Sequence, residues 1–139
     1  MTFRPYLAFA GNAREAFTRY QEIFGGELVL LDMTSIPPEA GPPPAGTPAD
    51  AIMHAALTTP DDALLMGADG PVDGTASNNI CVNVSLADPP AARKAFDALS
   101  EGGSVQQPMT ETFFSPAFGM CIDRYGIPWM VMVDQPMPA

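Results

Sequence analysis

The sequence predicts an α+β fold made of two consecutive copies of one unit, each consisting of a strand, a helix and three further strands. Two observations support this prediction. Helical patterns begin at Asn12 and at Asp88, and each pattern ends at a pair of glycines. A single offset also aligns Ala16 with Ala92 in the two helical stretches. A repeat of half the chain length is typical of a duplicated structural unit.

The first copy opens with residues 4–9, an apolar and aromatic run that predicts a strand. Asn12 is a favourable N-cap, and Glu15 three residues later completes a near capping box. The helix that follows is expected to end at Gly25. A second strand is expected over 27–33.

Residues 34–50 contain six prolines and two glycines. Because proline removes a backbone donor and fixes φ, this stretch is expected to be a loop. Two interpretations stay open, an ordinary surface excursion or a lid over a pocket. The stretches 51–59 and 63–67 then predict a hairpin.

The second copy repeats this order. Alternation of apolar and polar residues from Ile80 to Leu86 predicts a strand over 78–86. Asp88 is expected to cap a helix that has two prolines in its first turn. The remaining expected elements are a short strand at 104–107, a loop at 107–116 and a hairpin at 118–134 around a turn at 123–126.

Composition and charge narrow the choice of partners. Apolar residues make up 47% of the chain and charged residues 16%, which is typical of a globular domain. The net charge of −10 argues against nucleic acid and against an anionic membrane as partners. We find no signal peptide pattern and no apolar run of about 20 residues. With only Cys81 and Cys121 as thiols, a reduced cytoplasmic location is expected.

Four stretches carry a family resemblance: "PYLAFAGNAREAFTRYQEIFGGE", "DAIMHAAL", "ALLMGAD" and "FGMCIDRYGIPWM". They resemble the vicinal oxygen chelate superfamily (glyoxalase, bleomycin resistance and dioxygenase proteins), and within it the PhnB-like branch. The resemblance implies one glyoxalase-like domain over 1–139, with repeats at about 1–70 and about 76–135. Its mixed sheet would form a cup. The branch is often labelled a demethylubiquinone methyltransferase, but no Gly-rich nucleotide-binding turn follows the first strand.

The resemblance also locates four metal-ligand positions on the first and fourth strands of the two units. Catalytic members of the superfamily place His, Gln or Glu there. Here these positions fall on Pro5, Met66 (or Leu65), Cys81 and Met130. Proline cannot ligate a metal through its side chain, and thioether sulfur is a poor ligand for hard divalent ions. No metal and no other cofactor is therefore expected.

Strand alternation, in the phase that the resemblance implies, assigns side chains to the cup. On the third strand, Met53, Ala55 and Leu57 are expected in the core, and His54 faces the cup. Methionine side chains adapt to the shape of a ligand, although they can equally fill such a space as core. The expected ligand pocket consists of Leu7, Phe9, His54, Met66, Cys81, Asn83, Phe113, Phe114, Phe118, Met120, Met130 and Met132.

The candidates for catalysis are His54, Glu111 and Cys81. His54 is the only histidine, and it fits either a general base or a structural residue bonded to a neighbour. Glu111 fits either a ligand contact or a solvated loop acid. Cys81 has no basic neighbour in sequence that would lower the pKa of its thiol, which favours an inert residue.

Three functions remain open from the sequence. The first is metal-free binding of a small apolar or aromatic molecule in the cup, as in bleomycin-resistance proteins, with the ligand itself unknown. The alternative is an uncharacterised enzyme, of a lyase, isomerase or dioxygenase kind, that uses His54. The third is a metal enzyme whose ligands are not recognised here. The resemblance also implies a homodimer.

Overall fold

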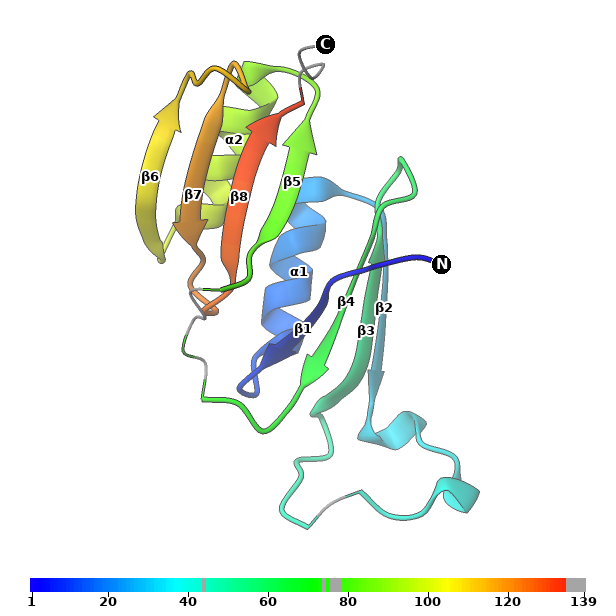
Figure 1. The fold of residues 1–139 in the computed structure, drawn as a ribbon. Coiled ribbons are helices and arrows are strands. Elements are labelled where there is room, and N and C mark those ends of the chain that lie inside the picture. The colour runs from blue at the N-terminus through cyan, green and yellow to red at the C-terminus, as the bar shows by residue number, and fades with distance from the viewer. Residues whose placement is uncertain (44, 74, 76–78, 135–139) are drawn as a thin grey trace. The chain divides into compact units, whose positions relative to one another are not determined.

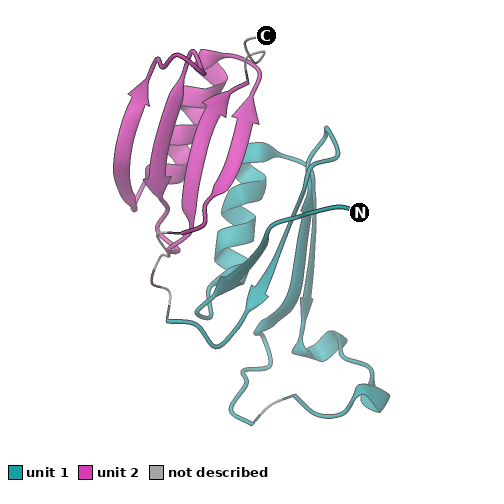
Figure 2. Cartoon of the chain, viewed as in Figure 1, with its two compact units in different colours: residues 1–74 teal, residues 75–139 magenta. Residues whose placement is uncertain are grey.

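The computed structural model describes residues 1–43, 45–73, 75 and 79–134. The chain forms two compact units, Met1–Gly74 and Thr75–Ala139 (Figure 2). Each unit has one α-helix against one face of a four-stranded sheet (Figure 1). Among the described residues no helix is long and apolar enough to cross a membrane.

The first unit has its strands in the order β1-β4-β3-β2. Strand β1 runs parallel to β4, and the other neighbours are antiparallel. Two short 3-10 helices, Met33–Ser35 and Pro38–Ala40, interrupt the proline-rich stretch. The elements are β1 (Tyr6–Phe9), α1 (Ala13–Phe24), β2 (Glu27–Asp32), β3 (Ile52–Thr58) and β4 (Leu64–Asp69).

The second unit repeats this topology with the order β5-β8-β7-β6, and β5 is parallel to β8. The predicted α+β fold with two βαβββ repeats is therefore confirmed. Its elements are β5 (Val82–Leu86), α2 (Pro89–Ser100), β6 (Ser104–Thr110), β7 (Phe118–Ile122) and β8 (Pro128–Val133). Strand β6 continues to Thr110, beyond the predicted end at residue 107, with two irregularities in its pairing to β7.

Helix α1 packs its apolar side on the first sheet. Ala16, Phe17 and Tyr20 recur at helical spacing and are buried. The Phe17 ring meets the Phe9 ring edge-on, with centroids 5.8 Å apart, and meets the Tyr20 ring in the same way at 5.6 Å. An aromatic cluster thus joins β1 to α1.

The first helix begins differently from the sequence prediction. The side chain of Asn12 makes no capping hydrogen bond. Instead, the Asp69 carboxylate at the end of β4 accepts hydrogen bonds from the Ala13 N–H and the Ile52 N–H, both at 2.9 Å. A carboxylate distant in sequence replaces the local cap and holds the starts of α1 and β3 together.

The second helix begins as predicted. Asp88 caps α2 by accepting a 2.8 Å hydrogen bond from the Ala91 N–H. The helix buries Ala92, Ala95, Phe96 and Leu99. Trp129 of β8 is buried on the sheet face that α2 covers, as predicted.

A β-bulge near the start of β3 changes which of its side chains are buried against the helix. Leu31 pairs with His54, but Asp32 pairs with Ile52, so Met53 is the extra residue. Ile52 is consequently fully buried, and Met53 is 37% exposed. The prediction that Met53 lies in the core is wrong, whereas Ala55 on the same strand is buried as predicted.

Candidate functional site

Each sheet has one face covered by its helix and one open face. Alternation and strand register identify the residues on each. The first open face consists of Tyr6, Ala8, Glu27, Val29, Leu31, His54, Ala56, Thr58, Leu64, Met66 and Ala68. The second open face includes Asn83, Ser85, Phe118, Met120, Met130 and Met132.

Two strand residues predicted for the ligand pocket, Leu7 and Phe9, lie on the helix-covered face of their sheet instead. Leu7 is 9% exposed and Phe9 is fully buried, and the Phe9 ring contacts Phe17 of α1. The prediction for both residues is wrong because β1 is apolar on both sides, so its sequence does not show which side faces the helix. Tyr6 and Ala8 occupy the open face instead.

Tyr6 and His54 form a polar pair on the first open face. The Tyr6 hydroxyl lies 3.0 Å from Nδ1 of His54, which is within hydrogen-bond distance. Their rings stack with centroids 5.7 Å apart and an interplanar angle of 29°. The pair reaches from β1 across β4 to β3. Tyr6 was not among the predicted pocket residues, because Leu7 and Phe9 were expected on the open side of β1.

Tyr6 is the hydrogen-bond partner that the described part of the chain gives His54. No ion pair to the imidazole is found among those residues. His54 is therefore bonded to a neighbouring phenol rather than to a carboxylate that would make it a stronger base. The other catalytic candidates, Glu111 and Cys81, belong to the second unit.

The second open face is dominated by methionine. Met120 and Met130 lie opposite each other on β7 and β8, and Phe118 lies opposite Met132. All four side chains are half-buried. The Asn83 amide on β5 lies 3.5 Å from the Met132 sulfur and donates a weak hydrogen bond to it. The strand faces predicted for β7 and β8 agree with this arrangement.

The loop 111–117 brings a further ring to this face. Phe114 contacts Phe118 edge-on, with centroids 5.1 Å apart, and Phe113 in turn contacts Phe114 at 5.3 Å. Phe113 itself is 89% exposed, and Glu111 is exposed. Of the predicted loop residues, Phe114 is thus the one in contact with the second open face.

The two cysteines are free thiols in different surroundings. Cys81 is half-buried directly before β5. Cys121 is fully buried opposite Trp129, and burial together with the nearby Asp123 charge raises the pKa of its thiol to about 11. A thiol with a raised pKa is a poor nucleophile and a poor metal ligand at neutral pH.

The four metal-ligand positions of the superfamily carry no set of metal-binding side chains. Met66 and Met130 lie on the open faces of their own sheets, and Pro5 and Cys81 immediately precede β1 and β5. Within 1–43, 45–73, 75 and 79–134, no three His, Cys, Asp or Glu residues gather closely enough to hold a metal ion. The residues at these positions therefore do not fit a hard divalent metal.

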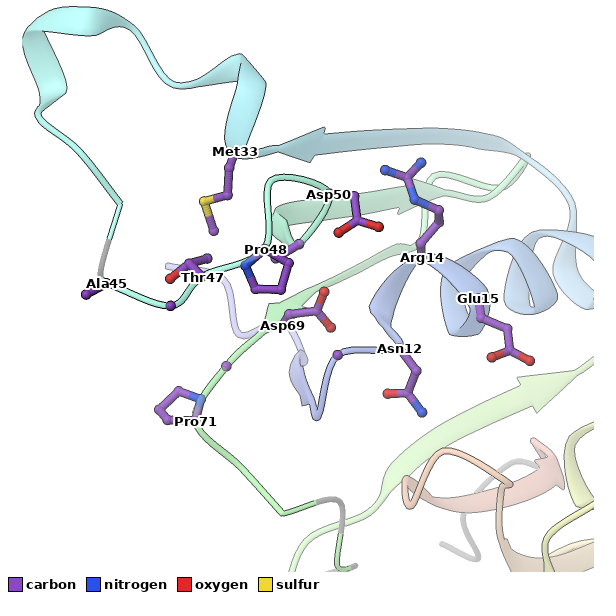
Figure 3. Close-up of a pocket in the computed structure, with 14 residues that line it drawn as sticks. Asn12, Arg14, Glu15, Met33, Ala45, Thr47, Pro48, Asp50, Asp69 and Pro71 are labelled. Atoms are coloured by element: carbon purple, nitrogen blue, oxygen red, sulfur yellow. The ribbon is translucent and has the colours of Figure 1, made fainter.

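A separate pocket of about 750 Å³ lies at the start of α1 (Figure 3). Two of the four charged residues that line it are engaged by the protein: Asp69 bonds two backbone N–H groups, and Arg14 lies 3.7 Å from Asp32. Hydrogen bonds from Thr34 and the charge of Arg14 lower the pKa of Asp32. The proline-rich stretch contributes to this pocket, whose lining includes Asn12, Glu15, Met33, Pro48, Asp50 and Pro71.

The duplicated βαβββ topology with one open face per sheet is a glyoxalase-like fold. A glyoxylase/bleomycin resistance protein/dioxygenase domain from Frankia sp. EAN1pec has this fold, with a TM-score of 0.63, 14% identity, and coverage of 97% of this chain and 98% of that one. A family model described as 3-demethylubiquinone-9 3-methyltransferase matches residues 1–132. The chain belongs to this family, which confirms the predicted PhnB-like membership.

Relatives span the whole chain. Protein PA1353 from Pseudomonas aeruginosa is 35% identical, with a TM-score of 0.83 and coverage of 98% of this chain and 99% of that one. Protein YjdN from Escherichia coli K12 is 28% identical over 145 residues, covering 99% of both chains. The family and the fold of the chain are thereby established.

Proposed function

We propose that the protein binds a small apolar or aromatic molecule on its open sheet faces, without a metal ion. The observation that carries this proposal is the methionine cluster of the second open face, where Met120, Met130 and Met132 lie half-buried beside Phe118. Unbranched thioether side chains change shape at low cost and contact aromatic rings favourably. Such a surface suits a ligand of irregular or flat shape.

Binding is a better supported proposal than methyl transfer. The family description names a methyltransferase, but the turn after β1 reads Ala10-Gly11-Asn12 and contains a single glycine. A nucleotide-bearing donor is usually held by a glycine-rich turn at that place in a βαβ unit. The first strand here leads directly into a helix whose start is fixed by Asp69.

A thermal-shift screen with aromatic metabolites and aromatic antibiotics tests the proposal. We expect at least one compound to raise the unfolding temperature in a concentration-dependent way, because a ligand that binds only the folded state stabilises it. Met130→Gln is expected to weaken the binding of that compound by about tenfold, since it places an amide in the apolar cluster.

Val105→Gln is the matched control. Val105 is an apolar residue of the same sheet, 49% exposed, but it pairs with Cys121 and so does not belong to the second open face. The control is expected to bind the compound as the unmodified protein does. The proposal fails if no compound stabilises the protein, or if Val105→Gln and Met130→Gln weaken binding equally.

We also propose a homodimer, on the strength of the superfamily resemblance. Each sheet has two edge strands, β1 and β2 in the first unit and β5 and β6 in the second. An unpaired edge is a natural place for a second chain to add strands. Multi-angle light scattering is expected to give twice the mass of 14.7 kDa, and the mass of a single chain would refute the proposal.

A further inference from the structure

The Tyr6–His54 pair is a polar point among apolar side chains of the first open face. The side chains nearest the pair on this face are Ala8, Val29, Leu31, Ala56, Met66 and Ala68, which offer no strong hydrogen bond. The polar residues Glu27 and Thr58 lie opposite each other at the other end of β2 and β3. Three of the nearest side chains are alanines, so the two rings and Met66 are the large groups around the centre of this face. A ligand that covers the Tyr6–His54 pair removes it from water, which costs free energy unless the ligand forms a hydrogen bond with the pair.

The geometry leaves one imidazole nitrogen available. Nδ1 of His54 is engaged by the Tyr6 hydroxyl at 3.0 Å, and the stacked phenol ring holds the imidazole in its orientation. No hydrogen bond to Nε2 is found among the described residues. His54 is half-buried and Tyr6 is 53% exposed, so the pair is accessible from the open face.

A ligand hydroxyl group can form a hydrogen bond with Nε2 in either neutral tautomer of the His54 imidazole. If the Tyr6 hydroxyl donates to Nδ1, Nε2 carries the proton and donates; if Tyr6 accepts, Nε2 accepts. A ligand hydroxyl both donates and accepts, so it satisfies both arrangements. A carboxylate satisfies only the first, and the net charge of −10 opposes the approach of an anion.

An aromatic ring matches the surroundings of the pair. The stacked rings of Tyr6 and His54 offer an edge and a face for offset contacts, and Met66 opposite Tyr6 adds a sulfur–aromatic contact. We therefore propose that His54, oriented by Tyr6, recognises the hydroxyl group of a hydroxylated aromatic ligand. This inference rests on the proposed binding function and names the ligand class for the first open face.

The experiment compares 2-naphthol with naphthalene, which differ only in the hydroxyl group, by equilibrium dialysis. The unmodified protein is expected to bind 2-naphthol about five- to tenfold more tightly, the size of one hydrogen bond. His54→Phe keeps a ring for stacking but removes the nitrogens, so it is expected to abolish this preference. Its affinity for naphthalene should stay within about twofold, because the apolar contacts remain.

Two further variants sharpen the test. Tyr6→Phe removes only the hydroxyl that orients His54, and it is expected to reduce the preference to an intermediate value. Thr58→Val removes a hydroxyl from the same face of the same strand, away from the pair, and is expected to keep the full preference. Both residues are exposed, so these variants should fold as the unmodified protein does.

The outcomes separate the two proposals. If both compounds bind with equal affinity, or if His54→Phe retains the preference for 2-naphthol, the inference about the pair is overturned and the binding function stands. If neither compound binds, aromatic binding at this face is refuted, and the inference falls with it.

Discussion

Nε1 of the Trp129 indole donates a 2.9 Å hydrogen bond to Oδ2 of Asp123, the residue that follows β7. The other carboxylate oxygen accepts from the N–H groups of Tyr125 and Ile127, both at 2.9 Å. Asp123 is only 5% exposed. One carboxylate therefore closes the turn between β7 and β8 and fixes the tryptophan that packs beneath α2.

Asp123→Ala is expected to destabilise the protein by about 2–4 kcal/mol, because it leaves three N–H donors without their acceptor in a buried place. Urea unfolding followed by Trp129 fluorescence measures this change. Asp97→Ala is the control, since Asp97 is an exposed carboxylate on α2. A loss for Asp123→Ala no larger than that of the control would show that the carboxylate does not hold the turn.

The start of α1 gives a second prediction. Asp69→Ala is expected to cost about 1–2 kcal/mol, typical for loss of a helix cap, because it removes the acceptor of the Ala13 and Ile52 N–H groups. Asn12→Ala is expected to cost less, since the Asn12 side chain makes no capping bond. The two variants are compared by thermal or urea unfolding. The reverse order of stability would mean that Asn12 caps the helix after all.

Two strand glycines that face a helix give a third prediction. A Cβ on Gly67 would lie 2.5 Å from the Leu7 carbonyl oxygen, which is fixed in the β1–β4 pairing. A Cβ on Gly119 would lie 2.6 Å from the Met109 sulfur, at the far end of a flexible side chain. Gly67→Ala is therefore expected to destabilise the protein by about 3 kcal/mol, and Gly119→Ala by about 1–2 kcal/mol.

Chemical denaturation of the two alanine variants side by side checks this order. Both glycines are buried, so a difference in exposure does not account for the result. Equal losses would indicate that β1 moves away from β4 as easily as the Met109 side chain rotates.

The last hairpin and the helix start of the second unit were predictable because their signals are local. The turn at 123–126 fixes the pairing of β7 with β8, and alternation then assigns Met130 to the open face and Trp129 to the helix side. Asp88 caps its helix from the adjacent position. Each of these features depends on residues a few positions apart.

The first unit depends on contacts that its sequence does not show. Strand β1 is apolar on both sides, so the side facing α1 is decided by packing of Phe9 against Phe17. The bulge at Met53 appears only when β3 is paired with β2. The Tyr6–His54 pair likewise joins strands that are separated along the chain and by β4. The site was therefore predicted less well than the fold.

Cys121 gives the last prediction, a fall in stability at alkaline pH. Burial, with a smaller contribution from the Asp123 charge, raises the pKa of its thiol from the ordinary value of 9.0 to about 11. Between these values the folded protein binds a proton that the unfolded chain has released, so stability decreases as pH rises. The contribution is complete below about pH 9 and is lost progressively towards pH 11.

Urea unfolding at a series of pH values from about 8 to about 11 measures how the free energy of unfolding changes with pH. Cys121→Ala removes the thiol and is expected to flatten the dependence on pH, although the variant is less stable at every pH because it leaves a small cavity beside Trp129. Cys81→Ala keeps the buried thiol and is expected to keep the slope. If Cys121→Ala loses stability with pH as steeply as the unmodified protein, the alkaline transition belongs to another group.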